Sequence, residues 1–204
     1  MTRRQIVGTL HGVAIEVAAW DGSAADVDLS CACMFASELG GGPPVGGLAH
    51  LDRALDGQLL HLRTEGVFAG QAGETLYLDR LPPAVTARAL LILGMGSPDG
   101  WRAAQLAPAV RAAVSTALAL RVGTGALAPS MLDSGLGPDQ TGGAPAAMVE
   151  GLAAALAVHA RVQAVALVRP RTLTRWTFDV GAARFEGAVA AFGAAVAEHQ
   201  PAGA

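Results

Sequence analysis

The first stretch that could do chemistry is a glycine-rich loop between an apolar run and an amphipathic one. Backbone N–H groups of glycine can approach a phosphate closely, and the N-terminus of a following helix attracts anions. Two prolines inside the loop remove two of the donors that such a cradle would use. The loop is therefore interpreted first as a plain connection, with anion binding as the alternative. Its candidate ligand-binding residues are Gly40, Gly41, Gly42, Gly46 and Gly47, and its prolines are Pro43 and Pro44.

A second glycine loop, Gly94-Met95-Gly96-Ser97, follows the apolar run 89–93. A single Gly-x-Gly lacks the third glycine and the spaced acidic partner of a dinucleotide-binding fingerprint. The pattern favours a tight turn. Ligand contact by Gly94, Gly96 and Ser97 is kept as a second hypothesis.

The remaining reactive side chains do not combine into a catalytic or metal-binding pattern. The chain has no lysine and no asparagine, which excludes a lysine base, ligand or Schiff base. Cys31 and Cys33 lie two residues apart on a predicted strand, so their side chains share one face, and we expect them to be buried. A lone Cys-x-Cys cannot assemble a zinc site. No cofactor and no metal are expected.

The charge balance limits the possible partners. All 14 basic residues are arginine, and the net charge of −3 argues against a nucleic-acid binder with a broad basic face. No purely apolar run is long enough to cross a membrane and no signal peptide is recognised, so we expect a cytoplasmic protein without a membrane partner. The one basic cluster is interpreted as solvated strand ends and loop, with an anion site as the alternative; its members are Arg161, Arg169, Arg171 and Arg175.

The elements that must position these residues follow from apolar periodicity. Leucines at spacings of three and four from Leu48 predict an amphipathic helix that Gly66 closes. Pro108 makes a break or kink possible early in a second helix. Residues 131–145 are predicted to be a mobile loop. The predicted strands are 6–17, 27–35, 74–78, 89–93, 122–128 and 162–168, and the other predicted helices are 101–120, 146–158 and 181–198.

Strands that alternate with helices predict an α/β fold with a mixed, mostly parallel sheet of about six strands, covered on both faces. Because no second core is visible, residues 1–200 are expected to form a single domain. Residues 201–204 are expected to be a frayed, disordered tail.

Residues 45–78 carry a resemblance. They contain Gly-Gly-Leu at the start of a helix, then Gly66, Phe68, Gly70 and Gly73-Glu74-Thr75-Leu76 at the start of a strand. This order resembles the N-terminal domain of the leucyl aminopeptidases of peptidase family M17, and the run 89–96 is similar as well. The resemblance implies a macro-domain-like, three-layer α/β/α module that precedes a catalytic domain.

The catalytic half of that family has no counterpart here. Its Asn-Thr-Asp-Ala-Glu-Gly-Arg-Leu segment is absent, and its two-metal site uses a lysine that this chain lacks. We therefore expect a stand-alone, non-enzymatic homologue that acts as a binding or interaction module with an unknown protein partner.

True macro domains, which bind ADP-ribose, offer a second resemblance. Asp21, Asp28 and Gly40-Gly41-Gly42 look like their skeleton, although this chain has no asparagine to position the distal ribose. ADP-ribose hydrolysis is not expected, but a sensor of a nucleotide or another small phosphate-containing ligand is the first alternative function. The second alternative is a self-associating scaffold that uses the alanine-rich helices 101–120 and 181–198.

Overall fold

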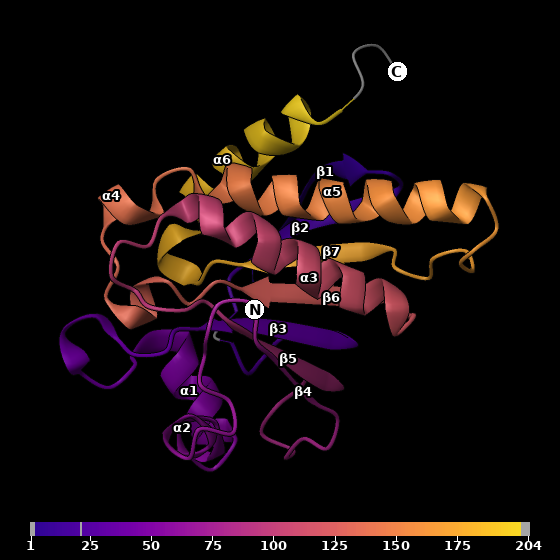
Figure 1. Ribbon diagram of the computed structural model, residues 1–204. Helices are drawn as coiled ribbons and strands as arrows, with labels where there is room; N and C mark the ends of the chain where they lie inside the picture. The colour runs from indigo at the N-terminus through magenta and orange to yellow at the C-terminus, as the bar shows by residue number, and fades with distance from the viewer. Residues whose placement is uncertain (1–2, 21, 201–204) are drawn as a thin grey trace.

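A computed structural model describes residues 3–20 and 22–200, without the side chain of Leu132. Its centre is a seven-stranded sheet of order β1-β2-β7-β6-β3-β5-β4 (Figure 1). The five inner strands β2, β7, β6, β3 and β5 run parallel, and the edge strands β1 and β4 pair antiparallel to their neighbours. The strands are β1 Arg4–Leu10, β2 Val13–Ala18, β3 Leu29–Met34, β4 Thr75–Leu78, β5 Ala89–Gly94, β6 Thr124–Ala128 and β7 Arg175–Asp179.

Helices cover both faces of the sheet, as the three-layer expectation requires (Figure 1). One face carries α1 and α2, and the other carries α3, α5 and α6. The helices are α1 Gly46–Ala54, α2 Gln58–Thr64, α3 Leu106–Ala119, α4 Pro138–Thr141, α5 Ala144–Ala164 and α6 Phe185–Glu198.

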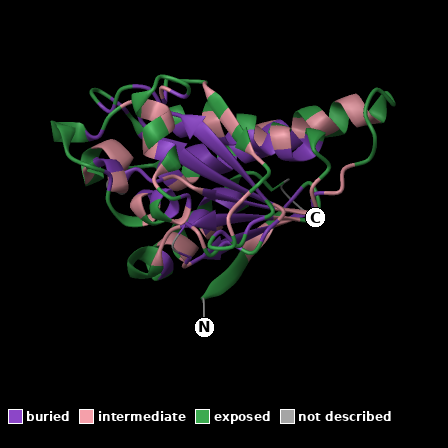
Figure 2. Cartoon of the chain, turned by 90° about the horizontal axis from the view of Figure 1, so that it is seen from below, coloured by how far each residue is buried: buried purple, intermediate pink, exposed green. Residues whose placement is uncertain are grey.

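The inner strands are apolar on both sides because each side packs against helices. Along β3, Leu29, Cys31 and Cys33 join the cluster under α3, α5 and α6, while Ala32 and Met34 join the cluster under α1 and α2. The inner strands are accordingly the most buried part of the molecule (Figure 2). Both cysteines are free and buried as predicted, and burial raises the pKa of the Cys33 thiol to about 12.

Two predicted elements are each divided in the structure. The predicted strand 6–17 is a hairpin, β1 and β2, with His11 and Gly12 at positive φ in the turn. The predicted helix from Leu48 is α1 and α2, separated at Asp56 and Gly57, which also have positive φ. The apolar spacing continues through the β1–β2 turn and through the α1–α2 break, because in each pair both elements contribute side chains to one apolar cluster.

The prediction of a strand at 162–168 is wrong. Helix α5 continues to Ala164, and the strand is Arg175–Asp179, which the sequence analysis missed. A short apolar run of β-branched residues does not by itself distinguish a helix end from a strand. With the divided hairpin this gives seven strands instead of six.

Smaller differences concern 101–145. Pro108 is the third residue of α3 and does not break it, because an N–H in the first turn has no helical acceptor. The predicted loop 131–145 holds a 3₁₀ turn, Leu132–Ser134, the short α4 and the start of α5. The predicted tail, 201–204, lies outside the described residues.

Candidate functional site

The parallel strands end at one edge of the sheet, where ligands commonly bind in α/β proteins. The segments that follow β2, β3, β5, β6 and β7 all leave from this carboxyl edge, on the left in Figure 1. Both glycine loops, 40–47 and 94–97, lie there because one follows β3 and the other follows β5. The fold therefore brings together the two glycine loops that the sequence singled out.

The N-terminus of α1 is occupied by a carboxylate of the chain itself. Asp133 lies in the segment after β6, and its Oδ2 accepts a hydrogen bond from the Leu48 N–H at 3.0 Å. The Gly47 N–H donates to the same carboxylate. The Asp133 carbonyl oxygen accepts from the Val45 N–H at 3.1 Å. Asp133 thus takes the place that an external anion would occupy at this helix N-terminus.

Burial raises the pKa of the Asp133 carboxyl group. The N–H groups of Leu48 and Gly47 and the charges of Arg184 and His50 lower it, but less than burial raises it. Ionisation of this carboxyl group is therefore less favourable in the folded protein than in water, because burial removes part of its hydration.

The glycines of this loop have different roles. Gly46 has a φ of +60°, and a side chain there would overlap the Asp133 carboxylate. Gly40 and Gly41 have φ values of +80° and +72°, and no atom lies near the position of a side chain at Gly40, Gly41 or Gly42. These three glycines are exposed, so the loop forms an open turn and does not press against other parts of the chain.

The start of this loop is fixed by a buried ion pair. Glu38 and Arg63 form two hydrogen bonds, of 2.8 and 2.9 Å, and the Arg63 guanidinium also donates to the Phe35 carbonyl oxygen at 3.2 Å. The side chains are 17% (Arg63) and 7% (Glu38) exposed. The pair ties the end of β3 to α2, on the same face of the sheet as α1.

The second glycine loop makes close contacts within the protein. A side chain at Gly94 would collide with the Gln71 carbonyl oxygen. The Gly96 N–H donates to the Gly70 carbonyl oxygen at 2.8 Å, and its carbonyl oxygen accepts from the Ala36 N–H at 2.9 Å. Ser97 is exposed, and its hydroxyl oxygen accepts from the Asp99 N–H at 3.2 Å. These contacts favour the tight-turn interpretation of this loop.

Asp28, one of the two aspartates proposed from the macro-domain resemblance, is not part of this arrangement. Asp28 lies at the opposite edge, just before β3, where its Oδ2 accepts from the N–H groups of Gly123 and Thr124, both at 2.9 Å, and its Oδ1 pairs with Arg88. It therefore cannot share a ligand with the glycine loops. Asp21 lies outside the described residues.

The sequence analysis missed two aspartates that the fold places at the carboxyl edge. Asp179 ends β7 and accepts hydrogen bonds from the N–H groups of Trp20 and Gly22 at 3.0 and 3.2 Å. Its strand had not been recognised, and Asp133 was assigned to a mobile loop. The available signal was that each acid follows or ends a strand of the parallel set, since such positions meet at one edge.

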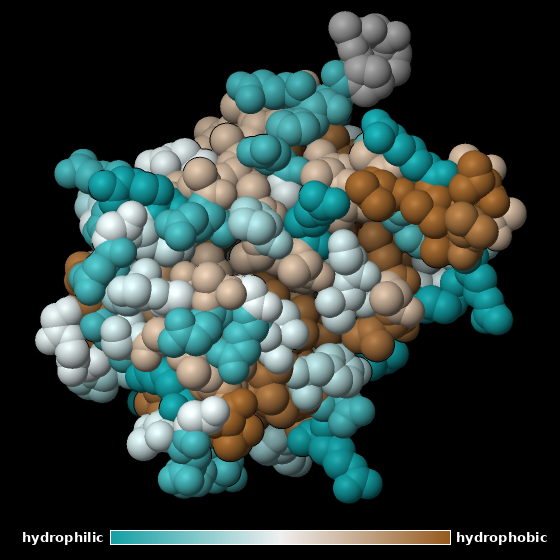
Figure 3. All heavy atoms as spheres, in the orientation of Figure 1, coloured by the Kyte–Doolittle hydropathy of each residue, from teal (hydrophilic) through white to brown (hydrophobic). Residues whose placement is uncertain are grey.

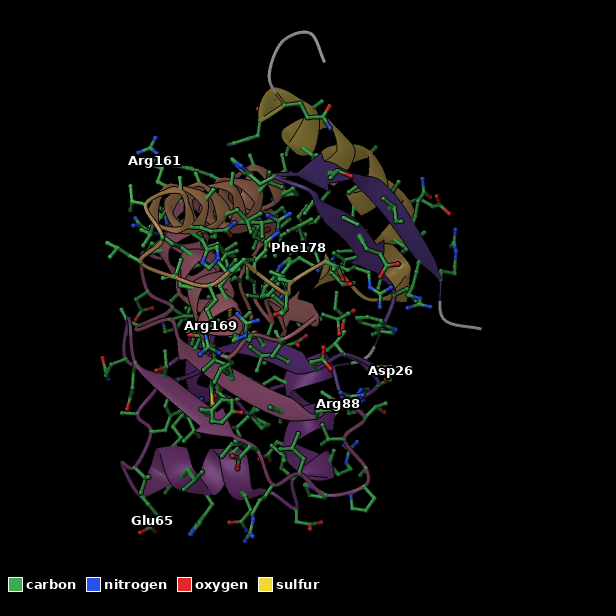
Figure 4. All side chains as sticks on the ribbon, turned by 90° about the vertical axis from the view of Figure 1, so that its right-hand side faces the viewer. Asp26, Glu65, Arg88, Arg161, Arg169 and Phe178 are labelled. Atoms are coloured by element: carbon green, nitrogen blue, oxygen red, sulfur yellow. The ribbon has the colours of Figure 1, made fainter. Side chains whose placement is uncertain are left out.

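At the other end of the molecule, α3 and α5 form the walls of a groove of about 520 Å³. We call this the α3/α5 groove; it is lined by Ser115, Leu118, Ala119, Arg121, Ala155, Val158, His159, Val162, Leu167, Val168 and Arg169. Apolar side chains gather on the surface at the end of α5 (Figure 3). Arg161 projects outward from α5, and Arg169 lies on the segment that returns beneath it (Figure 4).

Among residues 3–20 and 22–200, no three side chains of His, Cys, Asp or Glu come together in a way that could hold a metal ion. One helical stretch, Pro138–Ala164, is long and apolar enough to cross a membrane by length and composition, with 44% of its most apolar window buried in the fold. Core helices of folded domains often meet the same criteria.

Comparison with known proteins gives a family and a fold. Residues 40–163 match the sequence profile of the cytosol aminopeptidase family, N-terminal domain. No curated protein sequence matches the chain significantly. Among solved structures, a tomato leucine aminopeptidase variant is 16% identical with a TM-score of 0.62; the match covers 90% of this chain and 36% of the tomato enzyme. The chain thus spans about a third of that enzyme's length.

Macrodomains are similar to most of this chain. The Oceanobacillus iheyensis macrodomain with ADP is 10% identical with a TM-score of 0.68, and the match covers 97% of each chain. The Trypanosoma brucei macrodomain in complex with ADP is 18% identical with a TM-score of 0.57, over 89% of this chain and 68% of the other. At these identities the similarity establishes a macrodomain-like fold.

Proposed function

The chain belongs to the cytosol aminopeptidase family through its N-terminal domain, and we propose that it acts as a non-catalytic binding module that contacts another protein through the α3/α5 groove. The observation that carries this proposal is the exposed apolar surface at that groove. Ten large apolar side chains of the described residues are exposed; Val158, Leu167 and Val168 line the groove, and Leu120 and Val165 belong to the segments that carry its lining residues.

A contiguous exposed apolar surface is uncommon on a protein that works alone, and it usually marks a contact with a partner. Arg121 and Arg169 line the same groove, and arginine is enriched at protein interfaces. The groove lies at the end of the molecule opposite the carboxyl edge, so a bound protein would leave the glycine loops uncovered.

Photo-crosslinking tests the contact. A benzoylphenylalanine introduced at Leu167, which is 77% exposed, is expected to crosslink one specific protein in the cells that produce the chain. The same substitution at Val67, which is 65% exposed and lies beyond α2, is the matched control. The crosslinked protein is then purified, and its binding to the unmodified chain is expected to be lost with Leu167→Ser. Equal crosslinking from both positions would contradict the proposal.

A peptidase assay tests the proposal that the chain is not catalytic. We expect no release of p-nitroaniline from leucine p-nitroanilide with added Mn²⁺ or Zn²⁺ beyond that of the metal in buffer. Turnover that requires the protein and disappears with chelator would show that the chain is a metallopeptidase.

A second candidate function is the binding of a small phosphate-containing ligand at the carboxyl edge. The open turn Gly40–Gly42 favours it, because these glycines are exposed at the carboxyl edge and a structurally similar macrodomain was solved with ADP. Asp133 opposes it, because its carboxylate already occupies the α1 N-terminus. Calorimetry with ADP-ribose and ATP distinguishes the two functions: heat at micromolar ligand favours the sensor, and none at millimolar ligand removes it.

Self-association through the α3/α5 groove is a less suitable use of the same surface. A two-fold interface brings a patch against its own copy, so the arginines of one molecule would face those of the other. Sedimentation analysis is expected to show a monomer at concentrations at which the crosslinked partner binds.

A further inference from the structure

We infer that the α3/α5 groove takes an acidic amphipathic helix of its protein partner. This inference rests on the proposed function and specifies the chemistry of the contact. It follows from the shape of the groove, from the charges on its rim and from an unpaired polar atom in its wall.

The shape follows from the unequal lengths of the two helices. Helix α5 has 21 residues and α3 has 14, so at the usual helical rise they span about 31 and about 21 Å. Ala155, Val158 and Val162 line the groove at spacings of three and four, which is one stripe of α5. This stripe changes from buried at Ala155 to exposed at Val158, so the described residues leave the end of the stripe partly uncovered.

A third helix is the natural occupant of such a trough. Helices pack by placing the side-chain ridges of one between those of another at an axis separation of about 8–10 Å. Leu167 and Val168, in the segment after α5, also line the groove. An incoming helix would therefore have apolar contacts with this segment as well as with α3 and α5.

The charges on the rim specify an acidic partner. Arg121 and Arg169 line the groove, and Arg161 lies one helical turn beyond Val158. None of the lining residues is an aspartate or glutamate. Within residues 3–20 and 22–200, the side chains of Arg161 and Arg169 have no ion pair, whereas Arg121 donates to the Pro170 carbonyl oxygen at 3.1 Å and so holds the segment after α5. A glutamate beside an apolar stripe would pair with Arg169, the unpaired arginine that lines the groove.

The wall of the groove also holds an unpaired polar atom. The Nε2 atom of His159 is buried and has no hydrogen-bond partner among the described residues. Buried polar atoms in folded proteins nearly always have one. His159 lines the groove together with Val158 and Val162, so its unpaired nitrogen belongs to the wall that a bound helix would cover.

A lipid surface fits these observations less well. An anionic membrane would also attract arginines, but it presents a broad surface, whereas the apolar side chains here line a trough between two walls. The experiment nevertheless includes vesicles, so that the two partners are separated by measurement.

The probe is a fluorescein-labelled peptide of about 18 residues, or about five helical turns, with leucine at i, i+3, i+4 and i+7, glutamate on both flanks and alanine elsewhere. A twin peptide has arginine in place of each glutamate, and a scrambled peptide keeps the composition without the stripe. Fluorescence anisotropy is expected to give micromolar binding of the acidic peptide and binding at least about tenfold weaker for the other two.

Two pairs of variants locate the site. Leu167→Ser and Arg169→Glu are each expected to weaken binding of the acidic peptide by about tenfold or more. Val67→Ser and Arg53→Glu make the same changes at exposed positions on the α1/α2 side of the sheet and are expected to leave binding unchanged. All four positions are exposed, so circular dichroism is expected to show four folded proteins.

Each other outcome overturns the inference in an identifiable way. Equal binding of the acidic and basic peptides removes the charge argument, and binding that survives both groove variants removes the site. Binding to vesicles of phosphatidylcholine with about a third phosphatidylserine, without peptide binding, assigns the surface to a membrane. If crosslinking at Leu167 still identifies a protein whose contact segment is not an acidic helix, this inference fails while the proposed function stands. Absence of a specific crosslink removes both.

Discussion

At the scale of single residues, two aspartates show how position decides the behaviour of one functional group. Burial alone would raise the pKa of Asp28, but hydrogen bonds from the backbone N–H groups of Thr124 and Gly123, a hydrogen bond from the Thr124 hydroxyl and the charge of Arg88 lower it overall. Burial raises the pKa of Asp133 despite its hydrogen bonds to α1. Asp28 is a partly buried structural anion at one edge of the sheet, and Asp133 is a partly buried anion at the other.

These shifts predict opposite pH dependences for two variants. The pKa of Asp28 is lowered in the folded protein. Its contribution to the free energy of unfolding is therefore present above the ordinary pKa of 3.8 and is lost as the pH falls through the folded pKa. The pKa of Asp133 is raised in the folded protein. Its contribution to the free energy of unfolding is therefore complete below the ordinary pKa of 3.8 and is lost as the pH rises through the folded pKa. Urea unfolding of the wild type, Asp28→Asn and Asp133→Asn at about pH 7 and about pH 3.5 tests both.

For Asp28→Asn we expect a loss of about 1–3 kcal/mol at neutral pH, which shrinks in acid. For Asp133→Asn, which keeps an acceptor for the α1 N–H groups, we expect a loss below about 1 kcal/mol at neutral pH, which grows in acid. If the losses in free energy of unfolding for the two variants changed in the same direction with pH, the assigned environments would be wrong.

At the scale of elements, the loops at the carboxyl edge are held by specific contacts. The Glu38–Arg63 pair fixes the loop after β3, and Asp133 fixes the start of α1. The loop after β5 packs directly against the 70–74 segment, where Gly94 N–H donates to the Glu74 carbonyl oxygen at 2.8 Å. The turn Gly40–Gly42 is exposed and has no atom near its side-chain positions, which makes it a part of the edge that a ligand could reach.

This difference between the two glycine loops predicts unequal effects of one substitution. Gly94→Ala is expected to destabilise the protein by about 1–3 kcal/mol or more, because its side chain would collide with the backbone of the 70–71 turn. Gly42→Ala is the matched control: its φ of −77° suits any residue and no atom lies near its side-chain position. We expect it to change the free energy of unfolding by less than about 0.5 kcal/mol. Equal losses in chemical unfolding would disprove the close approach at Gly94.

At the scale of the whole molecule, one sheet separates two apolar clusters. Phe68 lies in the cluster under α1 and α2, and Phe192 lies in the cluster under α3, α5 and α6. Because the same strands contribute side chains to both, neither cluster is complete without the sheet. The expected unit of folding is therefore the entire domain.

Cooperative unfolding tests this expectation. Phe68→Ala and Phe192→Ala are each expected to cost about 3–5 kcal/mol and to lower the same single transition. Tryptophan fluorescence and far-ultraviolet circular dichroism are the two probes, since Trp20 lies in one cluster and Trp101 and Trp176 lie in the other. Two separate transitions, each sensitive to only one substitution, would show two folding units.

The sequence by itself determined the features that depend on local periodicity. The buried strands at 27–35 and 89–93, the amphipathic stripe from Leu48, the burial of Cys31 and Cys33 and the α/β class all follow from the spacing of apolar residues. The order of glycines and leucines in 45–78 also indicated the family. These signals are carried by neighbours in the chain, so no knowledge of long-range contacts was needed.

The tertiary structure alone decided which side chains meet. Asp133 caps helix α1 by accepting a hydrogen bond from Leu48, which lies 85 residues earlier in the chain, and Asp28 lies at the edge away from the glycine loops. Both facts depend on the order and direction of the strands, and local periodicity does not contain that information. The same holds for the α3/α5 groove, because 162–168 resembles a strand in isolation and only its packing beside α3 makes it the end of a helix and a turn.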